Sequence, residues 1–321
     1  KILNILEQDF QSVLAGKKPE NLYNPIGYIL MQSGKRLRPQ LVTMSVEMFG
    51  GDMQNAQFLA EAFEMLHNFT LIHDDIMDDA PIRRGKETVY KKWNGNIAIL
   101  SGDALANMAF QQLLKMPCPA EKLIQIAKLF SQTSIEVCEG QQFDLDFETQ
   151  ETVTIEEYIN MIRLKTAVMF AGCLKAGAMF ADADEQSQQA IYDFGVHLGI
   201  AFQLADDVLD VYAETPAFGK TIGGDIRDNK KTYLYLKALE LANPAQKATL
   251  QQLFATPTTD LDEKYKVVRQ IFDDVDIKKQ TEDTIQNYSE LSLQDLQRVN
   301  VPDSKKEAFK AIVLKLNNRQ K

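Results

Sequence analysis

Residues 55–79 read NAQFLAEAFEMLHNFTLIHDDIMDD, and this stretch decides the fold. Its apolar residues recur three and four positions apart over Asn55–Leu71, the spacing at which side chains share one face of an α-helix. The same spacing returns at residues 124–137, 155–180, 191–211 and 308–316. Alternating, strand-like runs are scarce. The pattern therefore predicts an all-α chain built from long helices.

Short turn signals separate the helical stretches. They contain glycine, proline or asparagine and fall at residues 33–34, 49–51, 94–95, 117–119, 223–224, 243–244 and 301–302. No internal repeat or low-complexity tract divides the 321 residues, and 45% of them are hydrophobic, which is enough for one large core. We therefore expect a single domain over residues 1–321.

Charge and cysteine content exclude several classes of function. The net charge is -10, which argues against a general nucleic-acid binder or a protein of anionic membrane surfaces, since both need a basic surface. No apolar run is long enough to span a bilayer. The three cysteines, Cys118, Cys138 and Cys173, show no metal or redox spacing, and so sparse a count suits a reducing cytoplasm. We expect a cytoplasmic protein.

Two acidic clusters interrupt apolar helical sequence. They are Asp74, Asp75, Asp78 and Asp79, and Asp206, Asp207 and Asp210. Like charges four residues apart on a helix cost roughly 0.2–0.5 kcal/mol, and acidic residues at a helix C-terminus oppose its dipole. A cation offsets both effects, and Mg²⁺ is held by one or two carboxylates together with substrate phosphates. One cluster alone fits a solvated acidic face, whereas two of the same D-D-x-x-D form favour a magnesium site.

Basic clusters stand beside the acidic ones. They are Gly34–Pro39 (GKRLRP), Arg83–Gly85, Lys220 and Lys230–Lys231. Lys35 and Arg38 precede or open a helix, so both can reach one diphosphate near its N-terminus. Any single pair is an ordinary exposed basic group. Their repeated placement next to the aspartates favours a site for a magnesium diphosphate.

Together these motifs resemble the trans-isoprenyl diphosphate synthases, or polyprenyl synthetases, along almost the whole chain. The matching segments are, in order, Gly34–Pro39, His67 with Leu71–Asp78, Arg83–Gly85, Gly102–Asp103, Gly140–Gln141 with Asp144, Lys165–Thr166, Phe202–Gln203 with Asp206, Asp207 and Asp210, Gly219–Lys220, Gly224–Asp225, and Lys230 with Thr232. Two D-D-x-x-D motifs in this order, with basic motifs between them, are highly specific. The resemblance implies a single large antiparallel helical bundle around a central active-site cavity, and a homodimer.

The resemblance also implies the reaction. Isopentenyl diphosphate would condense head to tail (1′-4) with dimethylallyl, geranyl or farnesyl diphosphate, in a magnesium-dependent step. Three Mg²⁺ would be held by Asp74, Asp78 and Asp206, with Asp75 and Asp210 as nearby or water-mediated ligands. The residues expected at isopentenyl diphosphate are Lys35, Arg38, His67 and Arg84. Those expected at the allylic substrate are Arg83, Lys165, Thr166, Gln203, Lys220 and Lys230, of which Lys165, Thr166, Gln203 and Lys220 would be catalytic.

Product length is the least defined expectation. In the family, the residue five before the first aspartate closes the pocket, and here it is the bulky Phe69. Helical geometry places Thr70 nearer than Phe69 to the stripe of Asp74. A short product of C15–C20 is therefore expected, with a longer-chain synthase as the alternative. A terpene cyclase, a non-catalytic partner subunit and an acidic metal-binding structural protein remain further alternatives, which the paired basic motifs and two intact acidic motifs disfavour.

Overall fold

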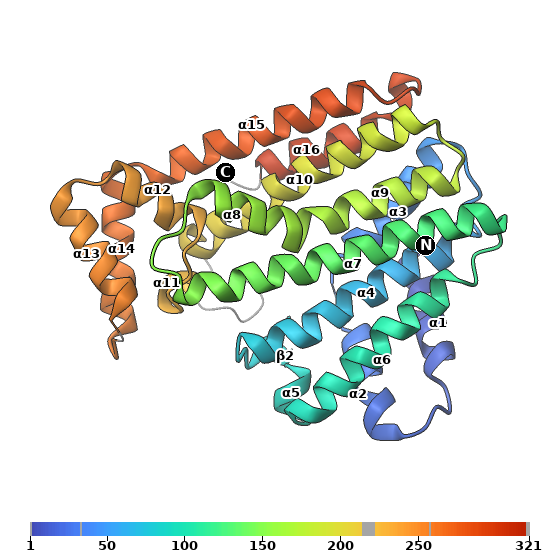
Figure 1. Ribbon diagram of the computed structural model, residues 1–321, viewed down its shortest axis with the longest axis horizontal. Helices are drawn as coiled ribbons and strands as arrows, with labels where there is room; N and C mark the ends of the chain where they lie inside the picture. The colour runs from blue at the N-terminus through green and yellow to red at the C-terminus, as the bar shows by residue number, and fades with distance from the viewer. Residues whose placement is uncertain (1, 33, 214–221, 257, 319–321) are drawn as a thin grey trace. The chain divides into compact units, whose positions relative to one another are not determined.

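A computed structural model describes residues 2–32, 34–213, 222–256 and 258–318. It is helical almost throughout, which confirms the all-α prediction (Figure 1). Within the described residues, no helix is both long and apolar enough to cross a membrane.

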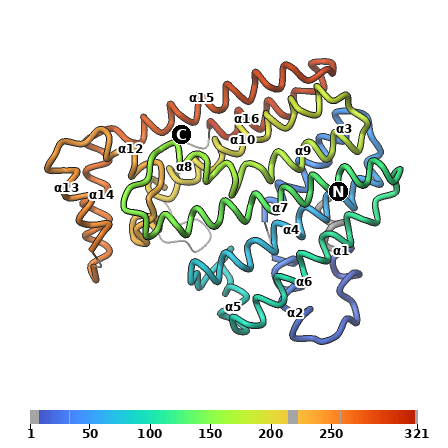
Figure 2. The backbone as a smooth tube through the Cα atoms, in the orientation of Figure 1, coloured from blue at the N-terminus to red at the C-terminus, as the bar shows by residue number. Residues whose placement is uncertain are grey.

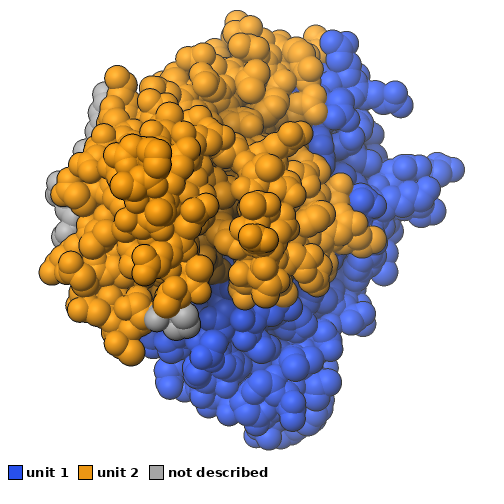
Figure 3. Space-filling model, turned by 60° about the vertical axis from the view of Figure 1, so that its left-hand side comes forward, with its two compact units in different colours: residues 1–134, 172–192 blue, residues 135–171, 193–321 orange. Residues whose placement is uncertain are grey.

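The backbone divides into two compact units, which Figure 3 colours separately. Unit 1 comprises residues 1–134 and 172–192, and unit 2 comprises residues 135–171 and 193–321. Three helices have residues in both units: α7 (Ala120–Thr149), α9 (Val168–Phe180) and α10 (Glu185–Tyr212).

Unit 1 is organised around one long helix, α4. Its other complete elements are α1 (Ile2–Leu14), α2 (Glu20–Leu30), α3 (Leu37–Met48), β1 (Ile82–Arg83), β2 (Lys86–Glu87), α5 (Val89–Lys92) and α6 (Gly95–Leu113). Helix α4 (Ala56–Met77) packs along α3 and α6, as the tube in Figure 2 shows. Leu59 and Phe63 on its apolar face are fully buried. Burial of each such side chain stabilises the folded state by about 1.5–3 kcal/mol. Phe130 of α7 meets Phe63 edge to face, with ring centroids 5.0 Å apart.

Unit 2 contains the remaining elements. They are α8 (Ile155–Ile162), η1 (Arg163–Ala167), α11 (Gly224–Arg227), α12 (Tyr233–Leu241), α13 (Pro244–Ala255), α14 (Leu261–Asp274), α15 (Ile277–Gln297), η2 (Asp303–Lys305) and α16 (Glu307–Asn318). A capping box of Thr154 and Glu157 starts α8, because each side chain bonds the other residue's backbone N–H. Phe194 of α10 packs edge to face on Phe309 of α16, which joins these helices.

The sequence pattern located the helices well but missed one irregularity. The helix predicted over residues 155–180 is present, yet residues 163–167 form a π-helical turn inside it. A π-helical turn inserts one extra residue into the helical repeat, which apolar spacing does not detect, and such turns are frequent at functional sites.

Candidate active site

The basic loop before α3 is anchored by its middle arginine. Arg36 is buried and has a left-handed backbone, with φ of 46°, which is unusual for a residue other than glycine. Its guanidinium donates to Glu64 Oε1 at 2.5 Å, to the Gln32 carbonyl at 3.0 Å and to the Leu30 carbonyl. Lys35, next to it in the chain, is exposed. The inward turn of Arg36 thus fixes the loop that carries Lys35 and Arg38.

Glu64 connects this loop to the middle of α4. The Asn68 side-chain amide donates to the Glu64 carbonyl at 2.7 Å and to its Oε1 at 3.1 Å. Arg36, Glu64 and Asn68 are all buried, so their charges and dipoles are compensated by one another. Because Asn68 follows His67, the same network holds the helical turn that presents His67.

The positive charges of four arginines act on the imidazole of His67. Burial, followed by the positive charges of Arg38, Arg84, Arg83 and Arg36, lowers the pKa of His67 well below its ordinary value. The ring is therefore neutral at pH 7 and can donate one N–H to an anion, while the arginines supply the positive charge. This part of unit 1 therefore concentrates positive charge near His67, which suits an anionic group.

The β1–β2 hairpin delivers two of these arginines. Arg84 and Gly85 form its tip with φ of 54° and 76°, the pattern of a tight two-residue hairpin turn. A Cβ on Gly34 would meet the Arg84 guanidinium at 3.1 Å, so glycine there allows Arg84 to lie against the basic loop. Arg84 Nη1 is buried and has no hydrogen-bond partner among the described residues. A buried donor in this state is suited to an anionic ligand.

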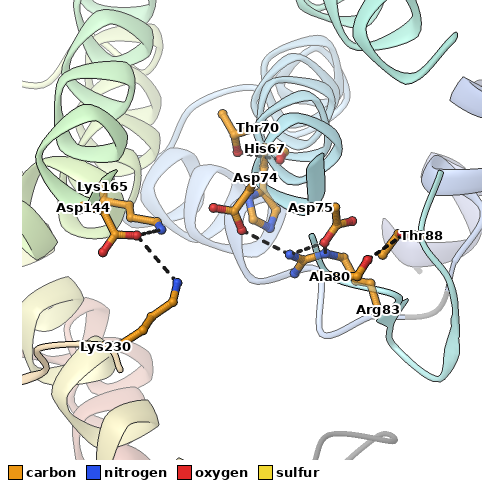
Figure 4. A network of polar contacts seen from close by, with 10 residues as sticks. All are labelled: His67, Thr70, Asp74, Asp75, Ala80, Arg83, Thr88, Asp144, Lys165 and Lys230. Atoms are coloured by element: carbon orange, nitrogen blue, oxygen red, sulfur yellow. Dashed lines mark hydrogen bonds and ion pairs between the residues drawn. The ribbon is translucent and has the colours of Figure 1, made fainter. Parts of the chain in front are cut away.

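The first acidic motif closes the C-terminal end of α4. Asp74 and Asp75 belong to its last turn, and Asp78 is the exposed C-cap residue. The Arg83 guanidinium donates to Asp75 Oδ1 at 2.7 Å and to Asp74 Oδ2 at 3.2 Å (Figure 4). Burial raises the pKa of the Asp75 carboxyl to about 6, although Arg83 acts in the opposite direction. Arg83 thus offsets the cost of placing carboxylates at the negative end of a helix.

In unit 2, the π-helical turn η1 places Lys165 and Thr166. Two glycines fix the backbone of this turn. A Cβ at Gly140 of α7 would lie 2.2 Å from the Lys165 backbone nitrogen, and one at Gly199 of α10 would lie 2.5 Å from the Ala167 Cα. Both distances are shorter than atoms can approach. Only glycine permits this packing, so both positions serve the geometry of η1.

Two lysines of unit 2 converge on one carboxylate. Lys165 Nζ lies 2.7 Å from Asp144 Oδ2, and Lys230 Nζ lies 3.9 Å from the same oxygen (Figure 4). Lys231 instead donates to the carbonyls of Phe147 and Gln150, at the end of α7. Both lysines line the pocket described next, but Lys230 lies near Asp144 whereas Lys231 is bonded to backbone carbonyls.

A line of four side chains crosses the adjoining pocket. Thr166 Oγ1 donates to Gln203 Oε1 at 3.0 Å, and Gln203 Nε2 donates to Asp207 Oδ1 at 3.0 Å. The Tyr158 hydroxyl donates to Asp207 Oδ2. Burial raises the pKa of Asp207 to about 7 and that of Tyr158 well above its ordinary value. The pocket is lined by these residues and by Asp144, Phe147, Glu148, Met161, Ile162, Lys165, Asp225, Asn229, Lys230, Lys231 and Thr232.

The second acidic motif places its three aspartates in different surroundings. Asp206 is exposed, Asp207 is buried and Asp210 is half-buried. The backbone N–H of Asp225 donates to Asp210 Oδ2 at 3.0 Å, so Asp210 also holds the start of α11. Lys220 lies outside the described residues.

The donor set suits a hard divalent cation. All the candidate ligand atoms are carboxylate oxygens, which Mg²⁺ prefers. Asp75 Oδ2 is buried and accepts no hydrogen bond within the described part of the chain, as expected of an oxygen reserved for a cation or a bound water. Among the described residues, no three acidic, histidine or cysteine side chains form a metal-binding group by themselves. Magnesium usually takes its further ligands from water and substrate phosphates.

Sequence reasoning assigned no role to several residues of these arrangements. They are Arg36, Glu64, Asp144, Tyr158 and Asp207. Arg36, Asp144 and Asp207 lie within or beside the motifs and were the easiest to find. Tyr158 precedes Lys165 by seven residues, which is two helical turns, so a search along that helix face would have found it. Phe69 and Thr70 lie on α4, where Phe69 packs edge to face on His73 with ring centroids 5.0 Å apart, and Thr70 Oγ1 donates to the His67 carbonyl at 2.8 Å.

Comparisons with known proteins identify relatives of this chain. The polyprenyl synthetase family model matches residues 19–271. A geranylgeranyl diphosphate synthase of Sulfolobus acidocaldarius is 40% identical over 249 residues, which cover 77% of this chain and 75% of that protein. A crystal structure of a geranylgeranyl pyrophosphate synthase superposes with a TM-score of 0.93 at 43% identity, covering 99% of this chain and 97% of the other.

A third relative was solved with ligands. It is a geranylgeranyl pyrophosphate synthase of Corynebacterium glutamicum, complexed with isoprenyl diphosphate and magnesium, with a TM-score of 0.87 at 26% identity over 99% of this chain and 96% of that one. The match over most of the chain, together with the paired acidic and basic motifs, shows that this protein belongs to the polyprenyl synthetase family of prenyltransferases.

Proposed function

We propose that this protein condenses isopentenyl diphosphate with an allylic diphosphate and releases a short-chain trans-polyprenyl diphosphate and diphosphate. One observation carries the proposal. Arg83 bridges Asp74 and Asp75 at the end of α4, and its charge, with those of three other arginines, also acts on the neutral His67 two helical turns earlier. Carboxylates for a cation and basic groups for an anion thus occur together, which is the combination that two diphosphate substrates and Mg²⁺ require.

Basic residues of unit 1 would hold isopentenyl diphosphate. The proposed ligands are Lys35, Arg38, His67 and Arg84. The buried Nη1 of Arg84 and the neutral imidazole of His67 give directed hydrogen bonds, and the guanidinium groups neutralise the phosphate charge. This substrate must keep its diphosphate, so binding rather than activation is the task of these side chains.

The second set of residues would hold and ionise the allylic diphosphate. We assign this role to Arg83, Lys165, Thr166, Gln203, Lys220 and Lys230. Lys165 and Lys230, which share Asp144 as a partner, supply charge to the leaving diphosphate. Thr166 and Gln203 offer oxygen atoms to the allylic carbocation. The carbon–oxygen bond breaks, the double bond of isopentenyl diphosphate attacks the cation, and a proton leaves to the departing diphosphate.

Three Mg²⁺ ions are proposed, held by Asp74, Asp78 and Asp206 with Asp75 and Asp210 in support. When bound, Mg²⁺ would neutralise the leaving diphosphate and promote ionisation. Arg83 supports the assignment, because it holds the Asp74 and Asp75 carboxylates in place without occupying Asp75 Oδ2.

We further propose that residues 1–321 act as one catalytic domain and that the protein works as a cytoplasmic homodimer. Outward-facing apolar residues on α6 support self-association, since Ile99 and Leu100 are 44% and 60% exposed. Sedimentation of the purified protein at twice the chain mass would agree with a dimer. A single species at the chain mass at micromolar concentration would contradict it.

Product analysis tests the reaction. The protein is incubated with Mg²⁺, labelled isopentenyl diphosphate and, separately, C5, C10 and C15 allylic diphosphates, and the dephosphorylated products are sized. We expect products that end at C15 or C20, as befits a short-chain synthase. Folded protein that elongates none of the primers would overturn the proposal, and a much longer product would keep the reaction but overturn the length.

Phe69 is the proposed floor of the product pocket, with Thr70 beside it. Truncating Phe69 to alanine removes a bulky ring and should lengthen the product by at least one C5 unit. Phe58, which lies on the same helix far from the acidic end, provides a matched Phe→Ala control. An unchanged product in Phe69→Ala would show that another side chain closes the pocket.

A further inference from the structure

Four side chains, Tyr158, Asp207, Gln203 and Thr166, form a continuous chain of hydrogen bonds. The roles proposed above do not explain why Tyr158 and Asp207 belong to it. Gln203 and Asp207 lie one turn apart on α10, and Tyr158 lies on α8. Tyr158 and Asp207 are each only 4% exposed, so their polar groups depend on partners inside the protein and not on solvent. We propose that Tyr158 and Asp207 are positioning residues that fix the amide orientation of Gln203 and thereby turn the lone pairs of Thr166 toward the substrate. The inference rests on the proposed prenyl transfer.

Asp207 accepts hydrogen bonds, so it favours the NH₂ group of the Gln203 amide over its carbonyl oxygen. Its Oδ2 accepts from the Tyr158 hydroxyl and its Oδ1 lies 3.0 Å from Gln203 Nε2. Turning the amide by half a rotation would bring its carbonyl oxygen against an oxygen of the ionised Asp207 carboxylate, and two acceptors at that distance repel. The NH₂ group of Gln203 is therefore held toward Asp207 and its carbonyl toward Thr166.

The orientation of Gln203 decides what Thr166 presents to the pocket. Thr166 donates its hydroxyl proton to Gln203 Oε1 at 3.0 Å. With that proton committed, the hydroxyl offers lone pairs on its remaining side, which suits a positively charged allylic group. In the reversed amide the NH₂ of Gln203 would donate to Thr166, and the hydroxyl proton would turn outward and repel the cation.

The two adjacent aspartates of the second motif thus divide their work. Asp206 is exposed and is a proposed metal ligand, whereas Asp207 is buried and bonded to Tyr158 and Gln203. Successive residues of a helix point about 100° apart, so one motif can serve both purposes. Tyr158 acts on catalysis through Asp207 and Gln203.

Tyr158→Phe removes one hydroxyl and leaves the ring in place. We expect kcat to fall about tenfold, the effect of one lost orienting hydrogen bond, while KM for isopentenyl diphosphate stays within about twofold. Tyr233→Phe is the matched control: its buried hydroxyl bonds Thr284 at 2.8 Å in the same unit, outside the pocket lining. Both variants should lose similar thermal stability, and only Tyr158→Phe should lose turnover.

A double-mutant cycle separates positioning from general damage. In a Thr166→Val background, which has no hydroxyl to orient, Tyr158→Phe should cause no further loss of kcat. Losses that multiply, or a Tyr158→Phe variant with wild-type turnover, would overturn the inference while leaving the reaction intact. A wild-type protein without turnover on any primer would instead overturn the proposed function, and this inference with it.

Discussion

At the scale of single residues, the buried Arg36 fixes the loop that carries the exposed Lys35. It points inward between two basic neighbours and ties their loop to Glu64 and to two backbone carbonyls. A guanidinium can make these bonds at once because its donors are fixed in a planar fork, whereas a lysine ammonium cannot reproduce them.

Arg36→Lys should therefore weaken the binding of isopentenyl diphosphate more than the chemical step. We expect KM for this substrate to rise about tenfold, with kcat reduced less than threefold, and unfolding free energy to fall by about 1–3 kcal/mol. Steady-state kinetics and denaturant unfolding measure both effects. Arg298→Lys is the control, since Arg298 makes a surface ion pair with Asp193 that contributes little. Equal KM values in the Arg36→Lys variant and the wild type would refute the anchoring role.

At the scale of elements, the π-helical turn η1 depends on two glycines of neighbouring helices. Gly140→Ala should displace the Lys165 backbone, because its Cβ would lie 2.2 Å from a backbone nitrogen that has no flexible side chain to yield. We expect kcat/KM for the allylic substrate to fall at least about tenfold, with loss of about 1–3 kcal/mol of stability. Gly95→Ala is the control, since nothing lies within 4 Å of the Cβ that would be added there. Full activity in Gly140→Ala would show that η1 tolerates a shift.

The long helices of this chain could be predicted from the sequence, whereas the π-helical turn could not. Helical spacing predicted the helices at 55–71 and 191–211, because a long apolar face buried on one side leaves a strong period. It could not predict η1, which packs closely against Gly140 and Gly199, residues distant in sequence. Tertiary packing of this kind leaves no periodic signal.

The candidate site also contains residues that the sequence points to and residues that only the structure reveals. Charged side chains such as Asp74, Arg83 and Lys165 could be proposed from the sequence because their residue types suit the chemistry. Arg36 and Tyr158 were missed, since their contribution is a hydrogen bond to a residue far along the chain. Candidate catalytic and ligand-binding residues can be proposed from residue type and spacing. The residues that hold them in place are identified only from three-dimensional contacts.

At the scale of the whole molecule, a buried carboxyl makes stability depend on pH. Glu61 of α4 is 1% exposed and accepts a hydrogen bond from Gln112 of α6. Burial, together with the nearby carboxyl of Asp9 on α1, raises the pKa of Glu61 from 4.5 to about 8. The folded protein therefore binds one more proton than the unfolded chain between these two pH values.

The sign of the effect follows from this extra proton. Stability from Glu61 is full below about pH 4.5 and is lost progressively as the pH rises toward 8. The slope in this window is at most about 1.4 kcal/mol per pH unit. Glu61→Gln, which cannot ionise, should flatten the curve of unfolding free energy against pH, measured by denaturant melts from pH 5 to 8. A Glu61→Gln curve as steep as that of the wild type would place the pH dependence elsewhere.

The central proposal is that carboxylates at the end of α4 use Mg²⁺ to drive prenyl transfer, and the Mg²⁺ dependence of product formation tests it most directly. Elongation of an allylic primer is measured against Mg²⁺ concentration in the wild type and in Asp74→Asn, which removes one charge at constant shape. The wild type should form product with Mg²⁺ and none in a chelator, and Asp74→Asn should be at least about 100-fold slower. Metal-independent elongation, or a folded Asp74→Asn variant with wild-type turnover, would contradict the account.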